Sequence, residues 1–378
     1  MVRVGIDLTA LPRLKGGVAF YLVELVGALQ RIDFENEYWL LARREHAQEL
    51  RRLAPRFTTI GIRLPSRPIR LAWEQSALPR LAARLRLDVL HSPHYTRPLA
   101  PLPCASVVGV MDMTFFALPE HHTFIKRLFF RAMIPASARR ADRLIAISES
   151  TKQDIERWLG IPGDRIDVTP LAVSPAYRED IDPAAIADVR RRYDLPADYV
   201  LYVGRLEPRK NLPRLLQAYG ILTARRPSTP ALVLAGAPGW HRAELDAALR
   251  PLAGRVRLPG YVPEADLPAL YAGARVFVYP SLYEGFGIPV LEALSCGVPT
   301  ITSGVSSMRE VAGAAAELID PLDMPQIADA IERLLEDTGR QLELKTRARD
   351  RARDFSWDTT AALTRESYQK AHDVYRRG

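Results

Sequence analysis

Cysteine is scarce in this 378-residue sequence, and its scarcity excludes two classes of protein. The two cysteines, Cys104 and Cys296, lie far apart in the chain and both in apolar surroundings. They provide neither a disulfide scaffold nor the paired thiolates of a cysteine metal site, so we expect no bound metal. Because this cysteine usage suits a reducing compartment, we expect a cytoplasmic protein.

Long hydrophobic runs and a dinucleotide-binding glycine motif are also missing. No run of about 18 apolar residues is present, so we expect no membrane span. The first residues, MVRVGIDLTALPRLKGG, lack the uncharged apolar core of a signal peptide. The first expected strand is not followed by GxGxxG, which argues against a dinucleotide-dependent dehydrogenase.

Lysine is rare as well, so the net charge of +8 comes almost wholly from arginine. One interpretation is a coding bias. The other is an anionic partner such as phosphate, an acidic lipid surface or nucleic acid. We expect no nucleic acid, because no recognisable binding module is present and basic residues are seldom interleaved with aromatic ones.

Short apolar runs alternate with helix-length amphipathic segments, which is typical of parallel sheets wrapped by helices. A first series starts with a strand at Val2–Leu8 and a helix at Val18–Gln30, and a second series starts with a strand at Tyr199–Val203. The polar, proline-bearing stretch VSPAYREDIDP separates them as a hinge. The sequence therefore predicts two Rossmann-like, doubly wound α/β domains, residues 1–175 and 182–356, facing across a cleft. A final helix, Trp357–Tyr375, could pack on either domain.

The stretch Ser281–Thr300, SLYEGFGIPVLEALSCGVPT, has the pattern of a ligand-binding loop before a helix. Gly285 and Gly287 let the backbone approach a ligand and aim free amides at an anion. Glu284 before the helix and Glu292 inside it can accept hydrogen bonds from the hydroxyls of a sugar or a ribose. Turn glycines and a helix-dipole acid are the simpler alternative for each feature alone, but their combination favours a ligand site.

A second candidate is Tyr199–Tyr219, where Arg205, Arg209 and Lys210 crowd the loop before a helix. Cations at a helix N-terminus are unfavourable by roughly 0.3–1 kcal/mol each. A bound diphosphate would reverse the sign of that interaction, whereas the alternative is a set of solvated surface cations.

These two stretches resemble the retaining glycosyltransferases of family 4, which have the GT-B fold of two Rossmann-like domains. The family signature of two glutamates with seven residues between them is matched by Glu284 and Glu292. Its Gly-Arg and Lys-Asn pairs are matched by Gly204-Arg205 and Lys210-Asn211. The stretches GYVPEADLPALYAGARVFVYPS and AELIDPLD also fit, so the resemblance covers nearly the whole chain.

The resemblance implies a nucleotide-sugar donor held by the C-terminal domain, with no metal or other cofactor. Arg205 and Lys210 would neutralise the diphosphate. Glu292 would bind the ribose and Glu284 the transferred sugar. The final helix, residues 357–378, would cross back onto the N-terminal domain. Further donor contacts would come from Gly204, Tyr261, Val262, Gly285, Phe286, Gly287 and Ile288.

The N-terminal half departs from the family pattern. Gly16 and Gly17 resemble its glycine-rich acceptor-side loop, although a plain turn explains them equally well. Relatives carry a His-Asp pair where this chain has Met111-Asp112. Asp112 stays a catalytic candidate, with a loop carboxylate as the alternative. The apolar thioether of Met111 fits a 6-deoxyhexose or a pentose, unless another group supplies the missing contact: water, His91, His94, His121 or His122.

The segment Thr123–Arg143 mixes large apolar residues with six basic ones, counted in its sequence. Such a segment can lie on an anionic membrane, or its apolar residues can be an ordinary core face. The first interpretation predicts peripheral attachment to the inner face of the membrane.

Together these features predict a retaining glycosyltransferase that moves a hexose, of the mannose or glucose type or a 6-deoxy form, to a hydroxyl acceptor. The acceptor would be lipid-linked and belong to a cell-surface glycan or glycolipid. Catalysis would be electrostatic through Arg205, Lys210 and helix amides, and the leaving phosphate would take the acceptor's proton. A catalytically inactive sugar-nucleotide-binding protein and a nucleotide-sugar epimerase are the alternatives.

Overall fold

The computed structural model of the protein describes residues 1–11, 17–239 and 242–377, and in it the chain divides into two compact units. Unit 1 comprises Met1–Leu171 and Ser356–Gly378, and unit 2 comprises Ala172–Phe355. The polar stretch interpreted as a hinge lies at the start of unit 2. No helix of the described residues is long and apolar enough to cross a membrane.

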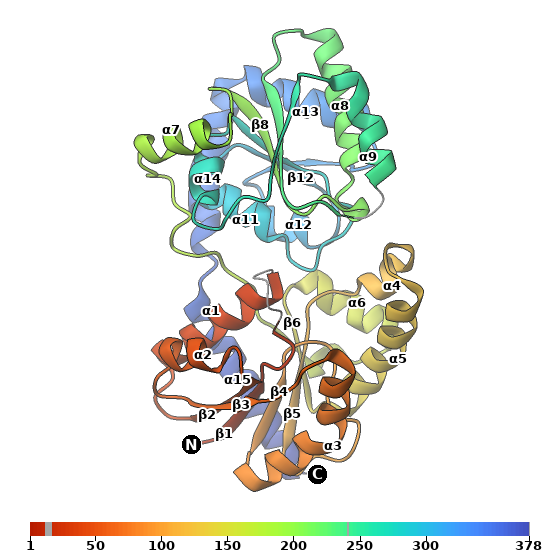
Figure 1. Cartoon of the computed structure of the whole chain (residues 1–378), viewed down its shortest axis with the longest axis vertical. Coiled ribbons are helices and arrows are strands. Elements are labelled where there is room, and N and C mark those ends of the chain that lie inside the picture. The colour runs from red at the N-terminus through yellow and green to blue at the C-terminus, as the bar shows by residue number, and fades with distance from the viewer. Residues whose placement is uncertain (12–16, 240–241, 378) are drawn as a thin grey trace. The chain divides into compact units, whose positions relative to one another are not determined.

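Unit 1 is built on a parallel sheet that has seven strands in the described residues, in the order β3-β2-β1-β4-β5-β6-β7 (Figure 1). Its inner strands are almost wholly buried and rich in valine, isoleucine and leucine, as expected for a sheet covered on both faces. The strands are β1 (Arg3–Asp7), β2 (Glu37–Arg43), β3 (Thr58–Ile62), β4 (Val89–Ser92), β5 (Ala105–Val110), β6 (Arg143–Ala146) and β7 (Ile166–Val168).

Helices pack on both sides of this sheet, and the last helix of the chain is one of them. The aromatic ring of Tyr368 on this helix is buried, and its hydroxyl lies 2.8 Å from Nδ1 of His91 on β4. The helices of unit 1 are α1 (Gly17–Ile32), α2 (Ala47–Leu53), α3 (Arg67–Leu85), α4 (Thr114–Ala117), α5 (Phe124–Arg140), α6 (Glu149–Leu159) and α15 (Trp357–Arg377).

Unit 2 repeats the design with a parallel sheet of six strands within its described residues, ordered β10-β9-β8-β11-β12-β13. The strands are β8 (Tyr199–Val203), β9 (Ala231–Ala235), β10 (Val256–Gly260), β11 (Val276–Tyr279), β12 (Thr300–Ser303) and β13 (Glu317–Ile319). The helices are α7 (Pro183–Arg192), α8 (Leu212–Arg225), α9 (Arg242–Leu249), α10 (Leu267–Ala272), α11 (Ile288–Ser295), α12 (Ser306–Ala312), α13 (Met324–Glu336) and α14 (Thr338–Arg353).

Each sheet has one point at which the strand order reverses, between β1 and β4 in unit 1 and between β8 and β11 in unit 2. In open α/β sheets, ligands bind outside the carboxyl ends of the strands at such switch points. The fold therefore marks two places, one in each unit, where functional residues are expected.

Candidate active site

The switch point of unit 2 is occupied by a buried ionic cluster centred on Glu284, in the loop after β11. Glu284 Oε1 accepts hydrogen bonds from Lys210 Nζ at 2.5 Å, Ser281 Oγ at 2.7 Å and Tyr279 Oη at 3.0 Å. Its Oε2 accepts one from Arg209 Nη1 at 2.5 Å. Because Arg209 and Lys210 follow β8, this carboxylate joins the loops at the ends of the two central strands.

The electrostatics of the cluster favour an ionised Glu284. Burial by itself raises the pKa of this carboxyl, but the charges of Arg209 and Lys210 outweigh burial and bring the pKa down to about 2. Burial and the neighbouring Arg209 lower the pKa of Lys210, whereas Glu284 opposes that effect. The pKa of Arg209 is raised, because Glu284 and Glu207 overcome its burial.

The backbone around Glu284 is fixed by two serines of α12. Its amide donates to Ser306 Oγ at 3.2 Å, and its carbonyl accepts from Ser307 Oγ at 2.8 Å. On the other side, Asn211 Nδ2 donates to the carbonyl of Pro280 at 3.1 Å and to that of Pro321 at 2.6 Å. Lys210 thus supplies a cation to the cluster, and Asn211 holds the surrounding loops through its two hydrogen bonds.

The cations crowded before α8 have carboxylate partners inside the protein. Besides Glu284, Arg209 Nη2 lies 2.9 Å from Glu207 Oε1. The crowding of Arg209 and Lys210 therefore does not by itself require a bound anion, because two carboxylates balance it. Arg205 differs from these residues because it is exposed. It directly follows Gly204, whose φ of +149° suits glycine.

The start of α11 offers unpaired backbone amides. Gly287 precedes the helix with φ +100°, a conformation that side chains disfavour. The amides of Phe286, Gly287 and Ile288 have no hydrogen-bond acceptor among the described residues. Three such donors at the positive end of a helix dipole favour the binding of an anion.

Glu292 on α11 lies in a second buried polar group, with its side chain between two tyrosines. Its Oε2 accepts a hydrogen bond from Tyr271 Oη at 2.7 Å, and Tyr177 Oη donates to the nearby Glu264 at 2.7 Å. Burial raises the pKa of Glu292 to about 7, the charge of Glu264 adds to this rise, and the tyrosine hydroxyls oppose it. Glu292 therefore titrates near neutral pH, unlike Glu284.

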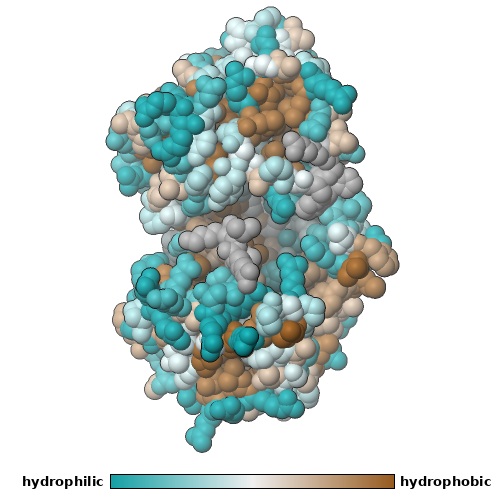
Figure 2. Space-filling model, in the orientation of Figure 1, coloured by the Kyte–Doolittle hydropathy of each residue, from teal (hydrophilic) through white to brown (hydrophobic). Residues whose placement is uncertain are grey.

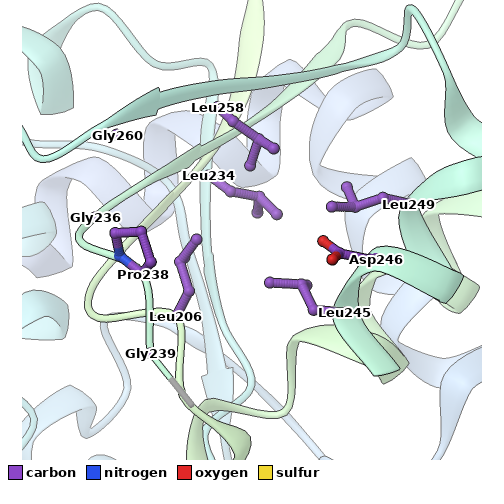
Figure 3. A pocket seen from close by; sticks show the side chains of 10 residues that line it. All are labelled: Leu206, Leu234, Gly236, Pro238, Gly239, Leu245, Asp246, Leu249, Leu258 and Gly260. Carbon is purple, nitrogen blue, oxygen red and sulfur yellow. The ribbon is translucent and has the colours of Figure 1, made fainter. Parts of the chain in front are cut away.

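An apolar pocket of about 170 Å³ lies at the carboxyl ends of β8, β9 and β10 (Figure 3). Tyr261 and Val262, which follow β10, are 64% and 4% exposed, so only the tyrosine projects from the surface. The pocket is lined by Leu206, Leu234, Gly236, Pro238, Gly239, Leu245, Asp246, Leu249, Leu258 and Gly260. These walls suit a flat, largely apolar group.

The predicted site residues of unit 1 are the two glycines Gly16 and Gly17 and the Met111-Asp112 pair. Gly16 lies outside the described residues, and Gly17 is the exposed first residue of α1. Met111 is 7% exposed at the end of β5. Asp112 Oδ1 accepts hydrogen bonds from the Thr114 amide at 2.9 Å and hydroxyl at 2.7 Å. Asp112 therefore caps the turn before α4.

The four histidines named as substitutes for Met111 lie in different surroundings. His91 is fully buried beside Tyr368, and His121 lies 3.4 Å from Glu120. His122 stacks on Phe115 with 4.0 Å between ring centroids. His94, in contrast, has Asp112 as a charged neighbour. His94 is thereby connected to Asp112.

Sequence reasoning gave no role to several residues of the two clusters. The sequence identifies Arg209 only as one of the crowded cations before the helix. It gives no role to the tyrosines beside Glu284 and Glu292. The one available signal was the position of Tyr279 and Ser281 at the end of a strand before Glu284. In the described residues, no group of three or more histidine, cysteine, aspartate or glutamate side chains could hold a metal ion.

Two family models match the chain, and they correspond to its two halves. Residues 190–354 match the family described as glycosyl transferases group 1, and residues 15–177 match glycosyltransferase family 4. The two parallel-sheet units and this match define a glycosyltransferase with the GT-B fold.

Similar proteins agree with this class. Over 271 residues the chain is 38% identical to O-antigen chain mannosyltransferase B of Escherichia coli, with 70% of each protein covered. It is 35% identical over 244 residues to the serotype-specific mannosyltransferase WbdA of the same species, covering 62% of this chain and 29% of that protein. The structure of Anabaena Alr3699/HepE with UDP and glucose is similar, with a TM-score of 0.74, 18% identity and coverage of 98% and 100%. The chain belongs to glycosyltransferase family 4, the group 1 glycosyltransferases, and is a hexosyltransferase.

The ionised Glu284 predicts a stability that depends on pH. The pKa is about 2 in the folded chain against 4.5 for a free side chain. Above about pH 4.5 the ion pairs therefore add about 3 kcal/mol to the free energy of unfolding. This contribution is lost as the pH falls toward 2. In urea unfolding, Glu284→Gln should lower the free energy of unfolding at pH 7 and much less at pH 3.

The matched control is Glu336→Gln. Glu336 pairs with Arg226 on the surface, where the carboxylate side chain is 56% exposed. Such a pair contributes about 0–1 kcal/mol to the free energy of unfolding, so we expect the variant to change that free energy little at both pH values. An equal loss for Glu284→Gln at pH 7 and pH 3 would contradict the ionised cluster.

Proposed function

We propose that the protein transfers mannose, with retention of its anomeric configuration, from a nucleoside-diphosphate donor to a hydroxyl of a growing cell-surface glycan. The observation that carries the donor assignment is the switch point of unit 2, where charged groups and unpaired amides lie at neighbouring strand ends. The relatives named as mannosyltransferases support the sugar, and the neighbour that binds UDP supports the nucleotide.

Each part of this region suits one part of the donor. The amides before α11, with Arg205 and Lys210, would stabilise the diphosphate. Glu284 would accept hydrogen bonds from the sugar, and Glu292 from the ribose. The apolar pocket beside Gly260 would take the base, whose flat faces match its leucine walls. With the donor bound in this way, these charges would lie where negative charge grows as the bond from C1 to the diphosphate breaks.

In the proposed reaction no side chain acts as the base. The acceptor oxygen forms a bond to C1 while the diphosphate leaves from the same face of the sugar, and the acceptor's proton passes to the leaving phosphate. This scheme needs no metal, and the proton that the acceptor loses is the one that the leaving phosphate gains. It also fits the state of Glu284, whose carboxylate is held by two cations and is a weak base.

Donor choice and stereochemistry test the proposal directly. The chain is incubated with mannose, glucose and 6-deoxyhexose donors and with mannose oligosaccharide acceptors, and free nucleoside diphosphate is measured. We expect turnover of a mannose donor, and a product whose anomeric NMR signals show the donor's configuration. An inverted product would refute retention. Nucleotide binding without turnover of any donor would point to an inactive binding protein, and a preference for a 6-deoxyhexose would connect specificity with Met111.

The titration of Glu292 predicts that nucleotide affinity rises with pH. Ribose hydroxyls donate hydrogen bonds to the ionised carboxylate, and the pKa of the free site is about 7. Binding should therefore release protons, and the dissociation constant should fall as the pH rises from 6 to 8. Calorimetry of nucleoside diphosphate binding in buffers of different ionisation enthalpy measures this release.

Glu292→Gln is the control, because the phosphates of the ligand titrate equally in both proteins. We expect weaker binding and a smaller proton release in the variant. The same proton release with Glu292→Gln would show that the ribose does not contact this carboxylate.

We also propose that α5 attaches the protein to an anionic membrane that carries a lipid-linked acceptor. Phe124, Ile125 and Leu128 of α5 are 67%, 79% and 63% exposed. The guanidinium of Arg127 lies over the ring of Phe124, 5.5 Å from its centroid. Figure 2 shows hydrophobic residues gathered where α4 and α5 lie in Figure 1. Exposed apolar side chains beside cations suit the boundary between lipid headgroups and acyl chains.

Vesicle binding separates this proposal from a chance surface patch. Ile125→Ser with Leu128→Ser should weaken co-sedimentation with phosphatidylglycerol vesicles by about tenfold or more, since each loses buried apolar area. Phe34→Ser is the control, because Phe34 is 76% exposed elsewhere on unit 1. Binding should also fall as salt rises. Equal binding of all three proteins would reject α5 as the contact.

A further inference from the structure

The switch point of unit 1 carries a second set of polar residues that the proposed donor site does not use. Here β1 and β4 are paired neighbours, and the strand order reverses between them. Asp7 ends β1, and the residues from His94 to Thr96 follow β4. The same topological rule that marks Glu284 in unit 2 marks this place as a ligand site.

A tight bend after β4 brings His94 to the end of β5. Pro93 packs so closely on Gly109 that a Cβ at that glycine would lie 2.8 Å from the carbonyl oxygen of Pro93. Tyr95 adopts φ +62°, and its amide donates to the Gly109 carbonyl at 2.8 Å. The bend therefore holds His94 beside the end of β5, which leads directly into Met111 and Asp112.

The imidazole of His94 is neutral and has hydrogen-bonding capacity to spare. Burial and the nearby charge of Arg70 lower the pKa of His94 to about 4, and Asp112 opposes this only in part. A neutral imidazole has one N–H donor and one nitrogen acceptor. The half-buried ring makes a hydrogen bond with the backbone of His94 itself, and no other residue in the described part of the chain hydrogen-bonds to it, so one ring nitrogen remains for a ligand.

Asp112 has spare capacity as well. Both hydrogen bonds from Thr114 go to Oδ1, and no donor among the described residues reaches Oδ2. Met111 beside it offers only a thioether. The half-buried pair of His94 and Asp112 thus presents one ring nitrogen and one open carboxylate oxygen at a strand end.

The groups behind this pair are fixed by one another. Glu74 on α3 is 1% exposed and accepts from Arg70 Nη1 at 2.8 Å and from Thr96 Oγ1 at 3.2 Å. Asp7 is 5% exposed, accepts from the Thr9 hydroxyl at 2.6 Å and is a charged neighbour of Glu74. This network orients Thr96 and Arg70 around the bend.

We propose that His94 and Asp112 form a sugar-hydroxyl-binding site at the switch point of unit 1. Sugar hydroxyls can donate hydrogen bonds to the remaining nitrogen of a neutral imidazole and to the open oxygen of a carboxylate. The inference rests on the proposed transfer of a sugar, and the sugar is either that of the acceptor glycan or that of the donor. Glu74 and Arg70 are positioning residues that hold the bend.

The test compares His94→Leu, which removes hydrogen bonding, with His94→Gln, which keeps it. His121→Leu is the matched control in the same unit. The wild type is first shown to turn over a mannose donor. Three constants are then measured for each protein: the KM for a mannose oligosaccharide, the dissociation constant of the nucleoside-diphosphate mannose, and the dissociation constant of the free nucleoside diphosphate. A wild type without turnover would therefore count against the proposed function, before the variants are compared.

His94→Leu should raise one of the two sugar-dependent constants about tenfold or more, since a buried hydroxyl would lose its partner. A change in the KM of the oligosaccharide identifies the acceptor, and a change in the affinity of the sugar donor but not of the free diphosphate identifies the transferred sugar. His94→Gln should recover most of the loss, and His121→Leu should change neither constant. The proposal is overturned if His94→Leu leaves both constants within twofold, or if His94→Gln is as defective as His94→Leu.

A measurement on the unmodified protein covers the case in which a variant does not fold. The ring signals of His94 are followed by NMR during addition of the oligosaccharide and, separately, of the mannose donor. We expect them to shift with one of the two ligands. An unchanged His94 ring at saturation with both would overturn the proposal.

Discussion

The structure of unit 2 depends on one interaction, the binding of two buried cations by the carboxylate of Glu284. Arg209 and Lys210 follow β8 and Glu284 follows β11, so the pair of contacts ties the two central strands together at their carboxyl ends. Removing one partner of a buried pair costs several kcal/mol, because the remaining charge has lost both water and its counterion. The rest of the region, from the serines of α12 to the clamp of Asn211, fixes the loops in which these charges lie.

The two switch points are built alike but differ in charge. In unit 2, cations, unpaired helix amides and an ionised glutamate suit a charged diphosphate and the sugar next to it. In unit 1, a neutral His94 and the carboxylate of Asp112 suit hydroxyls. The same fold, used twice with different side chains, therefore presents two strand-end sites of different chemistry.

The sequence predicted the fold class because its periodicity is clear where strands and helices are long and buried. The strand Tyr199–Val203 has the predicted bounds, and the predicted helix Val18–Gln30 corresponds to α1 (Gly17–Ile32). In contrast, β3 (Thr58–Ile62) and the three-residue β13 (Glu317–Ile319) were not predicted, because β3 is only partly buried and β13 is too short to show a period. The family was predicted from Glu284, Glu292 and the Lys-Asn pair, and the comparisons confirm it.

The pairing of these residues could not be read from the sequence, since Arg209 and Glu284 are 75 positions apart. Crowded cations suggested an external anion, whereas the fold supplies internal carboxylates. A double-mutant cycle on Lys210 and Glu284 tests the central claim most directly, with Lys210→Met, Glu284→Gln and the double variant compared in free energy of unfolding at pH 7. The account predicts a coupling above about 1 kcal/mol between the two positions. Additive losses, with no coupling beyond experimental error, would contradict it.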